Sequence, residues 1–286
     1  MSCAEQSPNP FYGEYDTPFG VPPFSEIQDE HYLSAFEQGI EEHEKEIDAI
    51  VASTEDPTFT NTLEALEASG ALLTKVSDIF YNLTSAKTSD RLQEIAKEVS
   101  PLLSQHRDNI MLNPELFARV KAVYDQRESL NLSDEQAKLL EETYKEFVRS
   151  GANLNEKAQA ELREINKKLS MLSLEFGENV LDENNRFELV IEDEADLAGL
   201  PESVISTAAE TATERGHDGT WVFTLHKPSL IPFLQYSEKR ALREKMFKGY
   251  INRGDHADEL DNKDILKEMV SLRVRRANLL GFETHA

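Results

Sequence analysis

Cysteine is almost missing from this chain of 286 residues, in which Cys3 is the single thiol. One thiol excludes an intrachain disulfide framework and any zinc site built from several cysteines. Long apolar runs are missing as well, since no stretch approaches the ~18 consecutive apolar residues of a membrane-spanning helix. The opening MSCAEQSPNP lacks the apolar core of a signal peptide as written. These features predict a soluble protein of the cytoplasm or periplasm.

Cys3 itself has two open interpretations. It is either an exposed thiol on a loose terminus, or the lipid-bearing cysteine of an exported lipoprotein whose leader has been replaced by Met-Ser. The Ser, Pro and Asn residues that follow it suit a tether in both cases.

Positive charge is scarce relative to negative charge. The chain has 54 Asp and Glu residues against 30 Lys and Arg, a formal net charge of -24. Such a balance repels phosphate backbones and anionic lipid, so it predicts no nucleic-acid partner and no membrane insertion. The charge is spread along helix faces, and the 39% of hydrophobic residues is enough for a packed globule, which argues against disorder.

Motifs that carry chemistry are also lacking. The chain has no G-x-x-x-x-G-K-[ST], no G-x-G-x-x-G and no G-x-S-x-G, so phosphate-loop, dinucleotide and serine-elbow chemistry have no backbone to use. A helical zinc peptidase needs H-E-x-x-H, because histidines four residues apart share one helix face. The nearest approach is His43-Glu44-Lys45-Glu46-Ile47, in which an apolar residue replaces the second histidine. We therefore interpret His43 as part of an ordinary solvated helix face.

The other histidines have no ligand spacing; they are His31, His106, His217, His226, His256 and His285. The cluster Asp255-His256-Ala257-Asp258 lies beside Gly254, where Asp and His commonly cap or solvate a turn. The segment Asp182-Glu183-Asn184-Asn185-Arg186 is rejected as a calcium loop, because Arg186 occupies a ligand position and Phe187 that of the required glycine.

Three arginines on the last predicted helix, Arg273, Arg275 and Arg276, are interpreted as balancing nearby acids and the negative end of that helix. The carboxylate pairs of so acidic a chain carry no information individually. From its residues alone, the sequence therefore predicts no catalytic, no cofactor-binding and no metal-binding residue in this chain.

Apolar residues at spacings of three and four predict long helices joined by short polar links, which is typical of antiparallel neighbours. The predicted helices cover 29–53 and 61–86, open after Ser89, at Asn113 and after Ser133, run for about 25 residues from Asn155, and return at 237–253 and 263–280. Pro101 should kink or divide the helix that opens after Ser89. Ser133 with Gln136 forms a capping box.

After these helices the sequence pattern changes from helical to strand-like. The runs RFELVIE and TWVFTL are rich in the branched and aromatic residues that suit strands. We therefore predict a mainly α fold of antiparallel helical hairpins, with a two-stranded β excursion near 187–192 and 220–225. The predicted domains are an extended arm rich in aromatics and proline at 1–25, a helical domain at 26–183, a β-containing insertion at 184–236 and a helical segment at 237–286.

Several long segments of unusual composition resemble the sequences of a known protein family. The segments NVLDENNRFELVIEDEADLAGLPES, GTWVFTLHKPSLIPFLQYSEKRALREKMFKGYINRG and NKDILKEMVSLRVRRANLLGF strongly resemble the thimet oligopeptidase family of zinc metallopeptidases. Within that family the resemblance is closest to bacterial peptidyl-dipeptidase and oligopeptidase A. The opening NPFYGEYDTPFGVPPFSEIQDEHYLSAFEQGIEEH is similar to the N-terminus of the peptidyl-dipeptidase type. The resemblance covers nearly the whole chain after Asn9.

The resemblance implies an N-terminal helical half that walls one side of a deep channel, with zinc, H-E-x-x-H and a further glutamate ligand on the C-terminal half. None of those positions exists in this sequence, so no catalytic or metal residue is carried over. The segment 237–286 is then the truncated start of the catalytic domain, and this chain alone is expected to be inactive and to bind no zinc.

Two hypotheses follow. In the first, this is the N-terminal, non-catalytic portion of a zinc metallopeptidase, monomeric as a whole, that hydrolyses short peptides and releases C-terminal dipeptides. In the second, it is a free-standing, catalytically inactive helical protein that binds peptides or serves as a scaffold.

Overall fold

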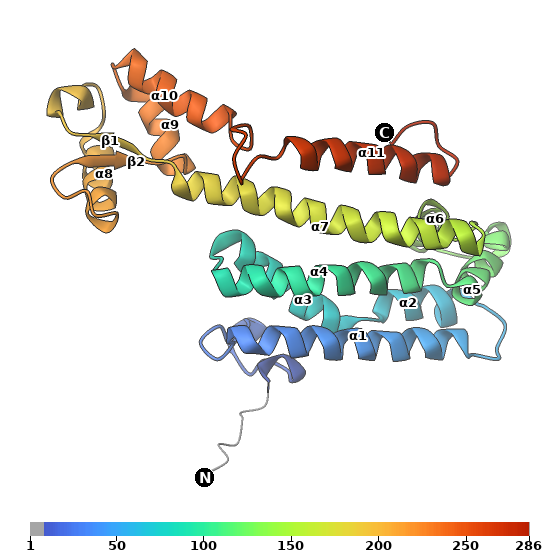
Figure 1. Ribbon diagram of the computed structural model, residues 1–286. Helices are drawn as coiled ribbons and strands as arrows, with labels where there is room; N and C mark the ends of the chain where they lie inside the picture. Colours follow the sequence, from blue (N-terminus) through green and yellow to red (C-terminus); the bar gives the residue numbers. More distant parts are fainter. Residues whose placement is uncertain (1–8, 286) are drawn as a thin grey trace, which may run out of the picture. The chain divides into compact units, whose positions relative to one another are not determined.

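The computed structural model describes residues 9–285, so Cys3 lies outside the described part. Within that part the chain is mainly helical (Figure 1), which confirms the predicted fold class. The helices are α1 (Asp29–Val51), α2 (Ala65–Ala68), α3 (Ala71–Ala86), α4 (Asp90–Met111), α5 (Pro114–Asp125), α6 (Asp134–Arg149), α7 (Glu156–Arg186), α8 (Glu202–Glu214), α9 (Lys227–Tyr236), α10 (Arg240–Ile251) and α11 (Lys263–Leu279), with strands β1 (Leu189–Ile191) and β2 (Trp221–Phe223). Over the described residues, no helix is both long and apolar enough to span a membrane.

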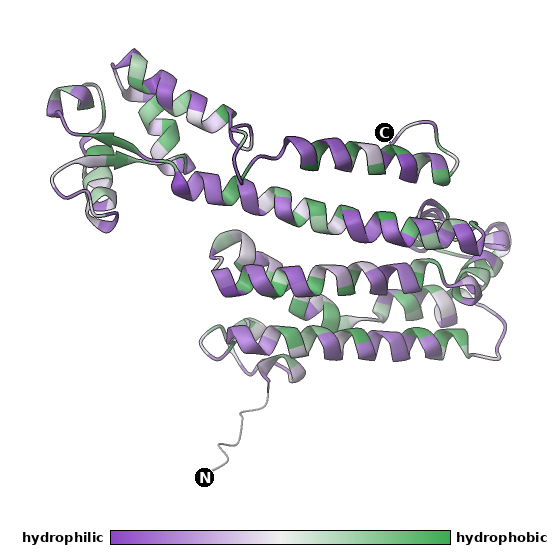
Figure 2. Ribbon diagram, viewed as in Figure 1, coloured by the Kyte–Doolittle hydropathy of each residue, from purple (hydrophilic) through white to green (hydrophobic). Residues whose placement is uncertain are grey.

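The chain divides into two compact units, one made of residues 1–171 and 272–286 and the other of 172–271. In the first unit α1 packs against α3, α4 and α5. Figure 2 shows that each of these helices carries both hydrophobic and hydrophilic residues, which recur from turn to turn as expected of helices with one apolar face. Gly39 permits the close approach of α1 and α3, because a Cβ there would lie 3.0 Å from the Cα of Leu73.

The core of the first unit has two apolar clusters along α1. One is a group of aromatic rings in edge or tilted contact, formed by Phe11, Tyr32, Phe36 and Phe80. The other gathers buried side chains from α1, α4, α5, α6 and the π-helix at Phe59–Glu64; its members are Ile47, Ile50, Phe59, Leu63, Ile110, Leu116, Phe117, Val120, Val123, Leu140 and Phe147. Of the aromatic residues in the predicted N-terminal arm, Phe11 is fully buried, whereas Phe19 is fully exposed.

The second predicted helix, 61–86, is wrong as a single element. The structure has a π-helix at Phe59–Glu64, the short α2, a break at Ser69 and Gly70, and then α3. Gly70 has φ +74°, and a Cβ there would lie 2.7 Å from His43 Nδ1, so only glycine suits the position. The break turns Ser69 toward α1, which shapes the site described below.

Other start signals were predicted correctly. The Asn113 side chain accepts from the amides of Glu115 and Leu116 at 3.0 and 2.9 Å. Both hydrogen bonds of the Ser133 and Gln136 capping box are present. α4 does not divide at Pro101 but remains one helix through it.

The second unit contains the β excursion that the sequence predicted. β1 and β2 pair antiparallel, with Leu189 opposite Phe223 and Ile191 opposite Trp221. Their inner side chains pack with those of α8, α9 and α10 into a separate core. The helix α9 was not predicted, because the helical pattern was expected to return only at 237. Two prolines obscured it: one stands in its first turn, and Pro232 lies inside the helix.

A loop beside the end of α7 is fixed by a buried carboxylate in the second unit. Glu183, 5% exposed, accepts the amide of Gly254 at 2.5 Å and contacts His256 Nε2 at 2.6 Å. Asp258 accepts the amide of Leu260 at 3.1 Å, which agrees with the capping interpretation of Asp255–Asp258. Residues 182–186 form the last turn of α7 and not a calcium loop.

Candidate functional site

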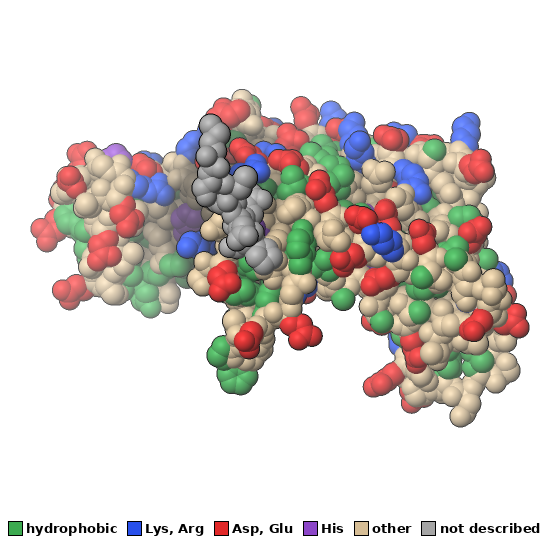
Figure 3. Space-filling model, turned by 90° about the horizontal axis from the view of Figure 1, so that it is seen from below, with side chains coloured by type: hydrophobic (Ala, Val, Ile, Leu, Met, Phe, Trp, Pro, Cys, Tyr) green, Lys and Arg blue, Asp and Glu red, His purple; other side chains and the backbone are tan. Residues whose placement is uncertain are grey.

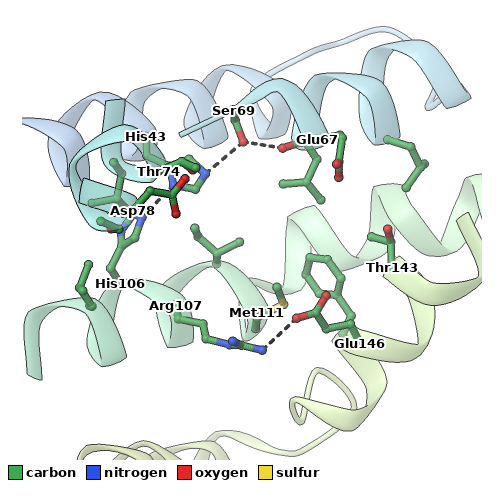
Figure 4. Close-up of a pocket in the computed structure, with 17 residues that line it drawn as sticks. His43, Glu67, Ser69, Thr74, Asp78, His106, Arg107, Met111, Thr143 and Glu146 are labelled. Atoms are coloured by element: carbon green, nitrogen blue, oxygen red, sulfur yellow. Dashed lines mark hydrogen bonds and ion pairs between the residues drawn. The ribbon is translucent and has the colours of Figure 1, made fainter. Parts of the chain in front are cut away.

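A cavity of about 500 Å³ lies in the first unit, between α1, α2, α3, α4 and α6 (Figure 4). Its apolar lining consists of Leu63, Leu66, Leu73, Leu103, Ile110, Met111 and Phe147, and its polar lining of His43, Glu67, Ser69, Thr74, Ser77, Asp78, His106, Arg107, Thr143 and Glu146. Volumes of this size are typical of small-molecule sites. Sequence reasoning named none of these residues as a site.

Two histidines from α1 and α4 meet on one wall of the cavity. His106 Nε2 lies 3.0 Å from His43 Nδ1, and His43 Nε2 lies 3.0 Å from Ser69 Oγ. His106 is 5% exposed and His43 is half-buried. The interpretation of His43 as part of a solvated helix face is therefore wrong, because its ring is enclosed by His106, Ser69 and the backbone at Gly70.

Hydrogen-bond accounting fixes the direction of this chain of contacts. Ser69 Oγ donates its one proton to Leu66 O at 2.6 Å, so it must accept from His43 Nε2–H. In neutral His43 the Nδ1 atom then carries no proton, so it accepts a hydrogen bond from His106 Nε2–H. His106 Nδ1 is left without a hydrogen-bond partner, with Glu44 Oε1 3.6 Å away.

This direction excludes one chemistry. A catalytic serine gives its proton to a histidine, which acts as the general base. Here His43 donates to Ser69 and the serine proton is held by a carbonyl. The Ser69, His43 and His106 arrangement is therefore not a poised nucleophile and base.

Burial also sets the protonation of the pair. Desolvation lowers the pKa of both His43 and His106, and the neighbouring His106 lowers that of His43 further. The carboxylate of Glu44 opposes both shifts without cancelling them. Both rings are therefore neutral at neutral pH.

The mouth of the cavity carries most of its charge. Glu67 from α2 and Asp78 from α3 are exposed and have no ion-pair or hydrogen-bond partner among the described side chains. Arg107 from α4 is paired with Glu146 from α6 at 2.9 Å, which Figure 4 shows on the opposite side of the cavity. The cavity thus combines an apolar interior with an excess of carboxylate.

No sequence pattern could have predicted that His43, His106 and Ser69 lie in contact. His43 and His106 are 63 positions apart, and Ser69 is 26 positions from His43. Their meeting depends on the packing of α4 against α1 and on the break at Gly70. The one available signal was Gly70 itself, a glycine inside an otherwise helical pattern.

Metal chemistry finds no support in the described residues. Between residues 9 and 285, no group of three or more His, Cys, Asp or Glu side chains could hold a metal ion. Ile47, which stands where H-E-x-x-H would have its second histidine, is 4% exposed and packs in the core.

Two of the arginines of α11, Arg275 and Arg276, have different surroundings. Arg275 pairs with Glu161 of α7 at 2.8 Å, as the charge-balancing interpretation predicted. Arg276 is half-buried, and desolvation lowers its pKa although Asp108 lies nearby. Both contacts lie within the first unit.

Comparisons with known proteins find a family model that matches the C-terminal segment and relatives that align with most of the chain. The family model described as peptidase family M3 matches residues 233–286. The dipeptidyl carboxypeptidase of Escherichia coli (strain K12) is 38% identical over 97% of this chain and 41% of its own length. The oligopeptidases A of Haemophilus influenzae and of Escherichia coli (strain K12) are 36% and 31% identical, over 93% and 94% of this chain and 39% and 40% of their own lengths.

The chain therefore spans about two fifths of the length of the curated relatives it matches. The identity extends over both units and includes the acidic helical part that carries no chemical motif. Residues 233–286 match the model of peptidase family M3, and nearly all of the chain is similar to curated dipeptidyl carboxypeptidases and oligopeptidases A, which confirms the resemblance predicted from the sequence.

Proposed function

We propose that this chain is the non-catalytic N-terminal portion of a zinc metallopeptidase that hydrolyses short peptides and releases dipeptides from free C-termini. The observation that carries the proposal is the 38% identity to a dipeptidyl carboxypeptidase over 97% of this chain. The identity to the oligopeptidases A is lower, 31–36%, and this favours dipeptide release over internal cleavage.

In this proposal the hydrolytic zinc is held by residues outside this chain. The described residues do not fit a catalytic zinc, because such a site needs three protein ligands around an open position. The one partial motif, His43 to Ile47, gives its last position to a buried core side chain. No step of peptide hydrolysis is therefore assigned to residues of this chain.

The helices have a structural role in the proposed enzyme. Long amphipathic helices such as α1, α4 and α7 suit one wall of a substrate channel, since a wall needs rigidity and solubility and no reactive group. The family-model match at 233–286 supports the proposal that the segment from 237 begins the catalytic domain. The helical domain at 26–183 and the insertion at 184–236 complete the proposed division.

The test compares two proteins. One is the product of the complete reading frame that contains this chain, and the other is residues 1–286 alone. Each is incubated with a tetrapeptide blocked at its N-terminus and free at its C-terminus, and products are identified by mass spectrometry. We expect the complete product to release the C-terminal dipeptide, to lose this activity with a zinc chelator, and to regain it with added zinc. Residues 1–286 should release none.

Other outcomes have defined meanings. Cleavage of internal bonds alone would replace dipeptide release by an oligopeptidase mode. A reading frame that stops at Ala286 and yields no peptidase would contradict the proposal. The alternative of an inactive peptide-binding or scaffold protein would then stand, and the cavity between α1 and α4 is the observation that favours it.

A further inference from the structure

We propose that the cavity of the first unit is a binding site for a cationic amphipathic group, namely an ammonium or guanidinium at the end of an aliphatic stem. The site uses residues of this chain alone and does not depend on zinc chemistry or on peptidase activity. The inference rests on the lining of the cavity, on the charges at its mouth, and on which hydrogen-bond donors are already in use.

The interior suits the stem. Leu63, Leu73, Ile110 and Phe147 are between 0% and 8% exposed, and all of them line the cavity. A stem of four to six carbons that enters such a cavity exchanges contact with water for apolar contacts, and each buried methylene group should tighten binding roughly fourfold. An apolar interior alone would accept any lipophilic ligand, so the charged groups at the mouth of the cavity determine which class of ligand binds.

The mouth suits a cation. Three carboxylates and one guanidinium line the cavity, and the guanidinium of Arg107 is already paired with Glu146 at 2.9 Å. Glu67 and Asp78 remain without a partner among the described residues, in a chain whose net charge is -24. Figure 3 shows acidic side chains spread among Lys and Arg over the visible face, so the field around the molecule also favours cations.

Donor use argues against an anion. An anionic group needs N–H or O–H donors, and the histidine pair has none to spare. His43 Nε2–H is used on Ser69, and His106 Nε2–H on His43. His106 Nδ1, buried and unpartnered, is an acceptor in this state. The imidazole wall therefore has no free donor for an anion, and its one spare nitrogen, His106 Nδ1, is an acceptor.

The experiment uses residues 1–286 and probes of equal stem length: hexylamine, hexanol and hexanoate. Binding is followed by NMR through the ring protons of His43 and His106, which locate the probe at this cavity. We expect hexylamine to bind roughly two- to thirtyfold more tightly than hexanol, because its ammonium can form two exposed ion pairs, with Glu67 and Asp78, each of which adds a modest gain in affinity. Hexanoate should bind most weakly.

Two variants locate the effect. Glu67→Gln with Asp78→Asn should remove the preference for hexylamine and leave hexanol unchanged. The matched control, Glu37→Gln with Asp48→Asn, changes charge equally at exposed positions of α1 outside the cavity and should keep the preference. Thr74→Phe fills the mouth from an exposed position and should weaken all three probes.

The source of the cation is settled by a second pair of probes. Acetyl-Ala-Lys-Ala-amide is compared with its norleucine counterpart, which has a similar stem and no charge. If the lysine peptide binds more tightly and shifts the histidine signals, the ligand is a basic peptide side chain. If only hexylamine binds, it is a small amine.

The proposal is overturned if hexylamine and hexanoate bind equally, if the histidine signals do not respond, or if the control variant loses the preference as the cavity variant does. None of these outcomes bears on peptide hydrolysis, because no hydrolysis is measured. Failure of the peptidase assay would likewise leave the cavity result unchanged.

Discussion

Each unit buries a polar side chain of a long helix, and the surroundings of the two side chains differ. Glu183 in the second unit is 5% exposed and receives a backbone amide at 2.5 Å and an imidazole at 2.6 Å. His106 in the first unit is also 5% exposed, but its Nδ1 has no hydrogen-bond partner. Glu183, with its partners in place, holds a loop, whereas His106, with a spare acceptor, lines a cavity.

The difference follows from what surrounds each group. Glu183 lies in the last turn of α7 and faces a loop whose Gly254 amide and His256 imidazole both contact its carboxylate. His106 faces α1, where the nearest carboxylate, Glu44, is 49% exposed and stays 3.6 Å away. The first arrangement should therefore contribute to stability, and the second should tolerate change and respond to pH.

Replacing Glu183 should have the largest effect on stability. Glu183→Leu removes the acceptor of the Gly254 amide and the partner of His256, and we expect a loss of about 3 kcal/mol in the second unit. Hydrogen exchange should rise in residues 252–262, and the unfolding midpoint should fall. Glu175→Leu, at an exposed position of the same helix, is the control. Equal effects of the two changes would mean that the buried contacts do not hold the loop.

Gly70→Ala should break the wall of the cavity in the first unit. The substitution demands φ +74° from alanine and places a Cβ 2.7 Å from His43 Nδ1, so we expect a cost of roughly 1–3 kcal/mol and a displaced His43 ring. Gly13→Ala is the control, because its φ is -113° and nothing lies within 4 Å of its Cβ. The measurements are thermal unfolding and the NMR signal of His43. An unchanged His43 signal in Gly70→Ala would contradict the proposed crowding.

Acid should weaken the first unit through the histidine pair. The pKa of His106 and of His43 is lowered in the folded state from 6.5, so the unfolded chain binds protons more readily. The stability that the neutral rings provide is present above pH 6.5 and is lost as pH falls below it toward the folded pKa. We expect the unfolding free energy of His106→Gln to fall less between pH 7 and pH 5 than that of the unchanged chain.

The control for this pH profile is His226→Gln, an exposed histidine of the second unit. It should leave the pH dependence as it is in the unchanged chain. Parallel profiles for all three proteins would show that the buried pair does not contribute. Binding of hexylamine should also weaken over the same pH range, because a protonated pair adds positive charge to the cavity wall.

The sequence predicted the helical fold well because its signals are local. Apolar spacing located α1, and the Asn113 and Ser133 caps located the starts of α5 and α6. Two features were missed because local signals conflicted with tertiary packing: the break between α2 and α3, and the helix α9. Ser69 and Gly70 interrupt a continuous apolar stripe, and α9 contains a proline at a position that sequence rules treat as non-helical.

The candidate site could not be predicted from such signals. His43 was interpreted as part of a solvated helix face and His106 only as a histidine without ligand spacing, because a pair 63 positions apart leaves no pattern in a single sequence. The direction of their hydrogen bonds depends further on the Leu66 carbonyl, which takes the Ser69 proton. Chemistry that depends on packing between helices is visible only after the helices are placed.

The smallest effect is expected from the ion pair at the cavity mouth. Arg107 and Glu146 lie 2.9 Å apart but are 65% and 50% exposed, so solvent and salt screen them. A double-mutant cycle with Arg107→Gln and Glu146→Gln should give a coupling energy of roughly 0.2–1 kcal/mol that shrinks at high salt. The pair matters more for selectivity than for stability. Glu146→Gln frees the guanidinium of Arg107, so binding of hexanoate should rise relative to hexylamine. A coupling energy well above this range would mean that the pair closes the cavity and excludes water from it.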